Sequence, residues 1–193
     1  MNDTFKVAKQ CLVASKKGNQ VLGMISRSFV SRNKNIIKKL YKSLVRPHLE
    51  YCIQAWRPHL IKDIEILEKV QRRASRMVIE CKGMEYEKRI AILGLTTLET
   101  RRRRADLLEV YKILNKHEGI DENSLFTRNI GKTRGNTCKL FKRRSNLDVS
   151  KFSFSKGVCN DWNELPNEVV TASCINGFKN GVDNILGKWG GFK

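Results

Sequence analysis

The chain of 193 residues is 40% hydrophobic and 30% charged, with a formal net charge of +19. This composition permits one domain, or two small ones that share a core, and the excess positive charge attracts polyanions, above all nucleic acid. The sequence contains no run of 18 apolar residues and no apolar N-terminal stretch, so we expect neither a membrane span nor a secretory signal.

A long first helix is predicted from about Phe5 to Phe29, because apolar residues recur there at steps of three and four. The pair Gly18-Asn19 weakens this pattern and could divide the helix in two. The predicted buried stripe consists of Cys11, Ala14, Gly18, Leu22, Ile25 and Phe29.

A second helix is predicted after Ser31 or Asn33, either of which can cap it. Pro47 should break or kink this helix near residues 45–46, with helical structure resuming as far as Trp56. Four cations step by four along one side: Lys34, Lys38, Lys42 and Arg46.

The third predicted helix, 62–80, has the clearest pattern in the sequence. Two pairs at i,i+4, Glu65 with Lys69 and Glu68 with Arg72, stand in the favoured order and neutralise part of its positive charge. Its apolar stripe comprises Ile64, Leu67, Val70, Ala74, Met77 and Val78. Its basic face comprises Lys69, Arg72, Arg73 and Arg76.

Further helices are predicted near 85–93, 152–165 and 173–186. Another begins at a cap on Thr96 or Thr97 and ends at the stop signal Gly119. It contains the run Arg101–Arg104, which cannot share one face because successive residues turn by about 100°. Arg104 lies three residues before the apolar Leu107, so it should point partly inward and need a carboxylate partner.

The segment 128–150 is basic, polar and rich in turn residues. We interpret it as a loop with a short β-hairpin, whose strands lie near 139–142 and 146–149. The predicted fold class is therefore mostly α, with a small hairpin inserted into the second half of the chain.

Residue types that bind metals or act as nucleophiles do not stand in a recognisable pattern. His48, Cys52 and His59 lack a fourth zinc ligand, so a zinc site or a Cys–His nucleophile there competes with a buried Cys and two polar caps around Pro47. The six Cys form no C-x-x-C pair, which favours free thiols in a reducing compartment. No Tyr-x-Asp-Asp turn that could hold catalytic metal ions is present. We predict no cofactor, no metal and no small-molecule substrate.

The basic helix faces are the positive signal. Residues 1–60 hold 12 Lys and Arg against 2 Asp and Glu, and cations in line on a helix can follow a phosphate backbone. A solvated surface or a membrane-surface helix is the alternative for any one face. Nearby aromatics are either core anchors or base-stacking groups: Tyr41, Tyr51, Trp56, Phe141 and Trp162. The candidate nucleic-acid-binding residues are Lys34, Lys38, Lys42, Arg46, Arg72, Arg73 and Arg76.

Six stretches carry a family resemblance: "VLGMISRSF", "LYKSLVRPHLEYCIQAWRPHLIKDIEILEKVQRRASRMV", "YEKRIAILGLTTLETRRRRADLLEVYKIL", "TRGNTCKLFKRR", "LDVSKFSFSKGVCNDWNELPNEVV" and "FKNGVDNIL". In order and spacing they resemble the C-terminal part of the reverse transcriptase of LINE-type non-LTR retrotransposons, of the jockey and CR1-like kind. The likeness covers about residues 7–186 and is most specific from Tyr41 to Val78.

The resemblance implies a helical, thumb-like bundle at 5–92, which in that family grips the primer–template, and a C-terminal extension at 95–190. The palm with its catalytic carboxylates precedes this region in the family, so we expect a truncated fragment that is not an enzyme. Its expected partners are RNA or an RNA–DNA hybrid, and a palm-containing chain on which it could dock. The expected location is intracellular, nuclear or cytoplasmic. The alternative is a helical protein-interaction remnant with no nucleic-acid role.

Overall fold

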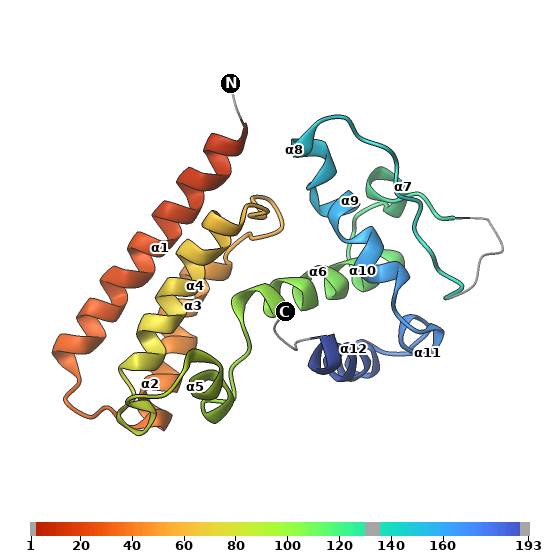
Figure 1. The fold of residues 1–193 in the computed structure, drawn as a ribbon. Coiled ribbons are helices and arrows are strands. Elements are labelled where there is room, and N and C mark those ends of the chain that lie inside the picture. Colours follow the sequence, from red (N-terminus) through yellow and green to blue (C-terminus); the bar gives the residue numbers. More distant parts are fainter. Residues whose placement is uncertain (1–2, 130–135, 190–193) are drawn as a thin grey trace. The chain divides into compact units, whose positions relative to one another are not determined.

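The computed structural model describes residues 3–129 and 136–189 and is mostly helical, as the sequence predicts (Figure 1). The chain divides into two compact units, an N-terminal unit of residues Met1–Glu99 and a C-terminal unit of residues Thr100–Lys193. Within the described ranges, the helices are too short or too polar to cross a membrane.

The N-terminal unit consists of a few long helices and several shorter ones. In chain order these are α1 (Asp3–Ser28), α2 (Lys34–Leu40), a π-helical turn (Tyr41–Val45), α3 (Arg46–Glu50), α4 (Ile61–Arg76), a 3₁₀ turn (Ile79–Cys81), α5 (Tyr86–Ile92) and the start of α6 (Leu98–Leu114). The side chain of Asn33 caps α2 by accepting a hydrogen bond from the backbone N–H of Asn35 at 2.8 Å, so one of the two predicted caps is confirmed.

Helix α1 runs unbroken through Gly18, where the sequence suggested a division. The glycine serves close packing there, because a Cβ atom on Gly18 would lie 3.1 Å from Val70 and 3.2 Å from Leu49. The predicted apolar stripe of α1 is buried from Cys11 to Ile25, whereas Phe29, just after the helix, is exposed.

Pro47 does not interrupt the helix near residues 45–46, but the regular α-helix gives way to a distorted turn directly before it. The chain widens into the π-helical turn, in which the backbone N–H of Arg46 bonds to the carbonyl of Tyr41, and then continues as α3. A π turn absorbs an extra residue, so the helix continues past the missing N–H of proline. Helical structure ends at Glu50 rather than near Trp56, because the backbone of Cys52 adopts a positive φ of 50°.

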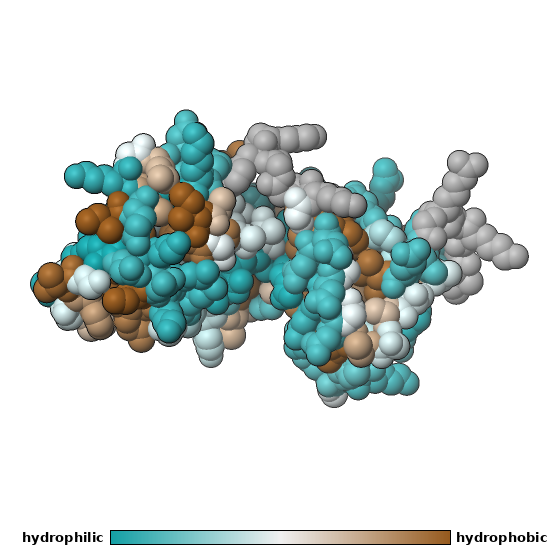
Figure 2. Space-filling view, turned by 90° about the horizontal axis from the view of Figure 1, so that it is seen from below, coloured by the Kyte–Doolittle hydropathy of each residue, from teal (hydrophilic) through white to brown (hydrophobic). Residues whose placement is uncertain are grey.

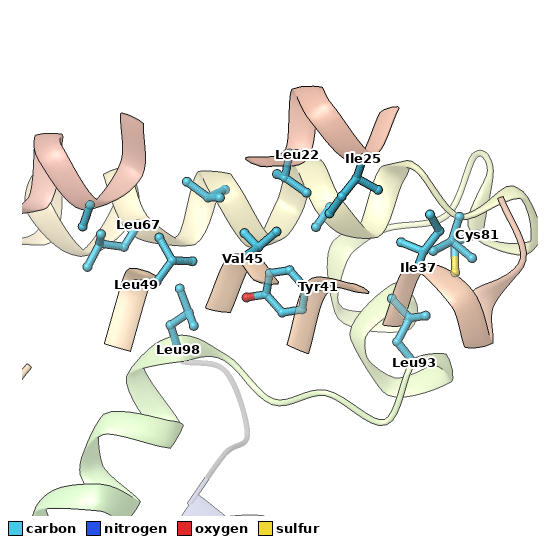
Figure 3. Close-up of a cluster of buried hydrophobic side chains, with 14 of the residues drawn as sticks. Leu22, Ile25, Ile37, Tyr41, Val45, Leu49, Leu67, Cys81, Leu93 and Leu98 are labelled. Atoms are coloured by element: carbon cyan, nitrogen blue, oxygen red, sulfur yellow. The ribbon is translucent and has the colours of Figure 1, made fainter. Parts of the chain in front are cut away.

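The core of the N-terminal unit is formed by α1, the α2–α3 segment and α4, joined by residues that follow α4 (Figure 3). Figure 3 shows Leu22, Val45, Leu49 and Leu67 around one apolar centre, with Leu98 from the start of α6 beneath them. All five side chains are almost completely buried. Burial of this kind is the main stabilising contribution to such a bundle.

A buried polar network connects α4 to its neighbours. The hydroxyl of Tyr41 donates to Gln71 at 2.7 Å, and the Gln71 amide donates to the hydroxyl of Tyr86 at 2.8 Å. Tyr86 in turn donates to the Glu68 carboxylate, which also accepts the backbone N–H of Leu98 at 3.1 Å. Glu68 therefore satisfies a free N–H group at the first turn of α6, where a negative charge is favoured.

The C-terminal unit is made of the rest of α6 and shorter helices: α7 (Glu122–Leu125), α8 (Asp148–Lys151), α9 (Phe154–Gly157), α10 (Cys159–Asn163), α11 (Asn167–Val170) and α12 (Ile175–Trp189). Its core centres on three aromatic rings. Tyr111 stacks on Phe178 with ring centroids 4.3 Å apart, and Trp162 lies 5.8 Å from Phe178. Trp162 is only 1% exposed, so it is a core anchor and not a base-stacking group.

The predicted β-hairpin is wrong for the described part of 128–150, which excludes 130–135. One antiparallel bridge joins Arg128 to Leu140, and residues 148–151 are helical. The side chain of Asn163 replaces a second strand, since it accepts the N–H of Leu140 at 2.8 Å and donates to its carbonyl at 2.9 Å. A side-chain amide thus satisfies the backbone groups that a hairpin would have paired.

Two expectations for α6 have opposite outcomes. The helix ends at Leu114 and not at Gly119, because Lys116 takes a left-handed conformation with φ 56° and His117 bonds back to the carbonyl of Lys112. This is a Schellman-type end with lysine in the position that glycine usually holds. The carboxylate partner expected for Arg104 is confirmed, since its guanidinium makes a two-point contact with the carboxylate of Asp183. The buried arginine of the run is Arg102, which is 5% exposed, and not Arg104.

Candidate nucleic-acid interface

A polar groove lies between α1 and α4 in the N-terminal unit. Its volume is about 540 Å³, and three cations are among its lining residues, which are Lys16, Asn19, Gln20, Gly23, Arg27 and Arg73. None of these six residues is acidic. The groove therefore presents positive charge and hydrogen-bond donors along an open surface, which suits a polyanion such as a phosphate backbone.

The groove follows from the pattern of α1. Residues 16, 20, 23 and 27 recur at helical spacing outside the buried stripe, so they form one polar row. Gly23 carries no side chain into the groove, and a Cβ atom there would still lie 3.8 Å from the guanidinium of Arg27. The row therefore has no side chain at position 23, beside its cationic end at Arg27.

Arg73, which lies on α4, forms the wall of the groove that faces this polar row. Its guanidinium donates to the side chain of Asn19 on α1 at 3.1 Å. This contact holds an exposed cation against the neighbouring helix, and an arginine with a fixed orientation loses less entropy when it binds a phosphate. Arg73 is thus the predicted site residue that the structure brings into the groove.

The other predicted cations of α4, Arg72 and Arg76, are not among the residues that line the groove. Arg76 is exposed at the end of the helix. Arg72 turns toward α5, where its guanidinium lies 5.0 Å from the ring centroid of Tyr86. Glu68, the expected ion-pair partner of Arg72, directs its carboxylate into the buried network.

The predicted line of cations along the second helix does not lie uniformly on the surface. Lys34 is exposed, whereas Lys38, Lys42 and Arg46 are half-buried. The Lys38 amine lies 3.2 Å from where a Cβ atom on Gly94 would be, and Arg46 pairs with Glu50 at 3.7 Å. The π-helical turn changes the rotation per residue, so a step of four no longer keeps these side chains on one face.

The zinc site weighed from the sequence has no geometric basis in the described ranges. There, no three His, Cys, Asp or Glu side chains come close enough to hold a metal ion. Cys52 is exposed rather than buried. Burial raises the pKa of the Cys81 and Cys159 thiols, which keeps both protonated and unreactive at neutral pH.

Sequence reasoning missed Lys16 and Arg27. The signal was present, because the polar row at 16, 20, 23 and 27 has the same period as the apolar stripe. The sequence could not show that this row lies beside Arg73, since that depends on how α1 packs on α4. Comparison with protein-family models, curated proteins and solved structures finds no match for this chain.

Proposed function

We propose that the N-terminal unit binds nucleic acid through the groove between α1 and α4. The observation that carries this proposal is that three cations, Lys16, Arg27 and Arg73, line a groove that has no acidic lining residue. Each contact between such a cation and a phosphate releases a condensed counterion, so affinity depends steeply on salt and little on sequence. The net charge of +19 adds long-range attraction.

The class of nucleic acid comes from the resemblance to LINE-type reverse transcriptases. A thumb-like bundle in that family would contact RNA or an RNA–DNA hybrid, and the catalytic carboxylates would belong to a palm. We accordingly propose a binding role without catalysis for this chain. The unbroken helix α1, packed against α4 with the groove between them, supplies an extended surface for such a duplex.

The alternative of a protein-interaction remnant receives less support. It relied on apolar faces at 36–45 and 64–78, and most of their apolar residues, including Ile37, Val45 and Val70, are buried within the N-terminal unit. On the face drawn in Figure 2, hydrophobic side chains form separate groups among hydrophilic ones. Large continuous apolar patches, which mark many protein interfaces, are not seen on that face.

The test is binding of the purified chain to a labelled RNA–DNA hybrid between about 50 and 200 mM salt. We expect the triple variant Lys16→Gln, Arg27→Gln, Arg73→Gln to reduce the slope of log K against log salt by about two to three, because each lost phosphate contact lowers that slope by a little under one. A matched variant, Lys62→Gln, Lys82→Gln, Lys88→Gln, removes the same charge from exposed positions outside the groove.

Comparing the two triple variants shows whether binding depends on the groove itself or only on the net charge of the chain. A steep slope that only the groove variant flattens supports the proposal. Equal slopes in both variants would mean that net charge, and not the groove, drives binding. A Kd that does not change with salt in the unmodified chain would contradict the proposal outright.

A further inference from the structure

The C-terminal unit contains a small pocket that is independent of the groove. It has a volume of about 230 Å³ and lies where the residues around α7, the segment after Leu140 and α9 converge. Its walls include Phe126, Phe141, Thr127, Ser155, Arg143 and Lys156. None of its ten lining residues is acidic.

Phe141 gives the pocket an accessible aromatic face. Its side chain is 53% exposed, although phenylalanine is usually buried. The backbone at Phe141 is fixed, because its N–H donates to the carbonyl of Thr127 at 2.7 Å. Phe126 is 5% exposed beneath the same wall and packs edge-on against Phe154. An exposed ring on a fixed backbone is a surface on which a base can stack.

Two cations line the same pocket as this ring, and each is oriented by a hydroxyl group. Arg143 donates to Thr127 at 3.1 Å, and Lys156 donates to Ser150. Both charged groups retain further donors after these contacts, since a guanidinium has five N–H bonds and an ammonium has three. Two cations within one small pocket favour a phosphate group, which arginine and lysine both bind.

The size of the pocket limits its occupant. Pockets for drug-sized ligands usually measure roughly 300 to 1,000 Å³, so a volume of about 230 Å³ accepts only one small unit. An aromatic side chain and two cations within one pocket match the two parts of a single nucleotide, its base and its phosphate. A base within a duplex is already stacked on both sides, so the fitting ligand is unpaired.

We propose that this pocket binds one unpaired nucleotide, with the base stacked on Phe141 and the phosphate held by Arg143 and Lys156. The nucleotide can come from a single-stranded end or be a free nucleoside monophosphate. The proposal does not depend on the groove between α1 and α4, because every residue that it uses lies in the C-terminal unit.

The experiment is calorimetric titration of the full chain with adenosine 5′-monophosphate, adenosine and inorganic phosphate. We expect the monophosphate to bind at least tenfold more tightly than either part alone. Phe141→Ala should weaken it roughly tenfold, in line with the contribution of base–aromatic stacking, while Phe141→Trp should preserve binding. A second arm compares a labelled RNA hairpin that has an unpaired end with its blunt form, and thereby tells a strand end from a free nucleotide.

The adjacent residue Arg144 provides a matched control. Arg143→Gln should weaken binding of the monophosphate several-fold, whereas Arg144→Gln, which removes the same charge from an exposed position outside the lining, should leave it unchanged. Equal losses in both variants would overturn the proposal, and so would phosphate binding as tightly as the monophosphate. The groove triple variant should keep monophosphate binding, so failure of the groove proposal would be seen separately.

Discussion

The two units reach stability in different ways. The N-terminal unit packs long helices, so its apolar contacts are distributed along α1 and α4 and are supplemented by the network around Gln71. The C-terminal unit has several helices of only four or five residues, which have little stability of their own. It depends more on a few large side chains, with Trp162 and Phe178 at the centre.

Individual arginines in the two units also differ in their partners, and Arg46 of the N-terminal unit is itself paired with Glu50. In the C-terminal unit, Arg103 pairs with Asp161 at 2.8 Å and Arg104 pairs with Asp183. In the N-terminal unit, Arg73 is held by a neutral asparagine and keeps its charge for a ligand. A basic run in the sequence, such as Arg101–Arg104, therefore does not by itself indicate a binding surface, because carboxylates from distant helices can neutralise it.

The largest expected effect is the loss of the central tryptophan. Trp162→Ala should destabilise the C-terminal unit by about 3–5 kcal/mol, since a buried aromatic side chain leaves a cavity when it is truncated. It also removes the indole N–H that donates to the carbonyl of Cys138 at 2.9 Å. Hydrogen exchange followed by mass spectrometry would locate the loss. The control Trp56→Ala removes a half-buried ring from the N-terminal unit and should cost less.

Equal protection of the C-terminal amides from hydrogen exchange before and after Trp162→Ala would contradict the contrast between the two units, because stability would then not be concentrated on one ring. Loss of amide protection confined to residues 100–193 would support the contrast and show that the two units unfold separately.

Alkaline pH should destabilise the N-terminal unit through two tyrosines, and burial also raises the pKa of Tyr111 in the C-terminal unit. Burial, followed by nearby carboxylates, raises the pKa of both Tyr41 and Tyr86 far above the ordinary value. The folded state therefore keeps both hydroxyls neutral while the unfolded state ionises near pH 10. The stabilising contribution is complete below pH 10 and is lost as pH rises above it, by about 1.4 kcal/mol per pH unit for each tyrosine.

Urea unfolding at a series of pH values from 9 upward measures this slope, and absorbance at 295 nm reports the phenolates. Tyr41→Phe should remove one tyrosine's share of the slope. Titration of all four tyrosines near pH 10 in the folded chain would contradict the buried network.

The long helices could be predicted from the sequence because burial of one face imposes a period of 3.6 residues. The features that were missed have two causes. The π-helical turn before Pro47 is a local change of helix type that the period of 3.6 does not reveal. The side chain of Asn163 replaces a strand beside Leu140 through a contact between distant residues. The candidate site divides in the same manner, since Arg73 was predicted whereas Lys16 required the packing of α1 on α4.

Two glycines on α12 give a smaller and more local test. A Cβ atom on Gly181 would lie 2.8 Å from a methyl group of Val169, whereas none of the described neighbours comes within 4 Å of one on Gly187. Gly181→Ala should therefore destabilise the C-terminal unit by about 1–3 kcal/mol through overpacking. Gly187→Ala should stabilise it by up to about 1 kcal/mol, because alanine favours a helix over glycine. Thermal unfolding of both variants provides the measurement, and equal shifts would argue against close packing of α11 on α12.

The smallest effect is expected from the ion pair between Arg104 and Asp183. The contact has two points, but the side chains are 31% and 50% exposed, so solvent screens the attraction and the pair should contribute about 0.2–1 kcal/mol. A double-mutant cycle with Arg104→Gln and Asp183→Asn isolates this coupling from the cost of each single change. The coupling should decrease at high salt, because an exposed pair is screened. A coupling well above 1 kcal/mol that salt does not change would mean that the pair is a structural anchor of α6 on α12, and stability in the C-terminal unit would then rest on its arginines as well as on its aromatic core.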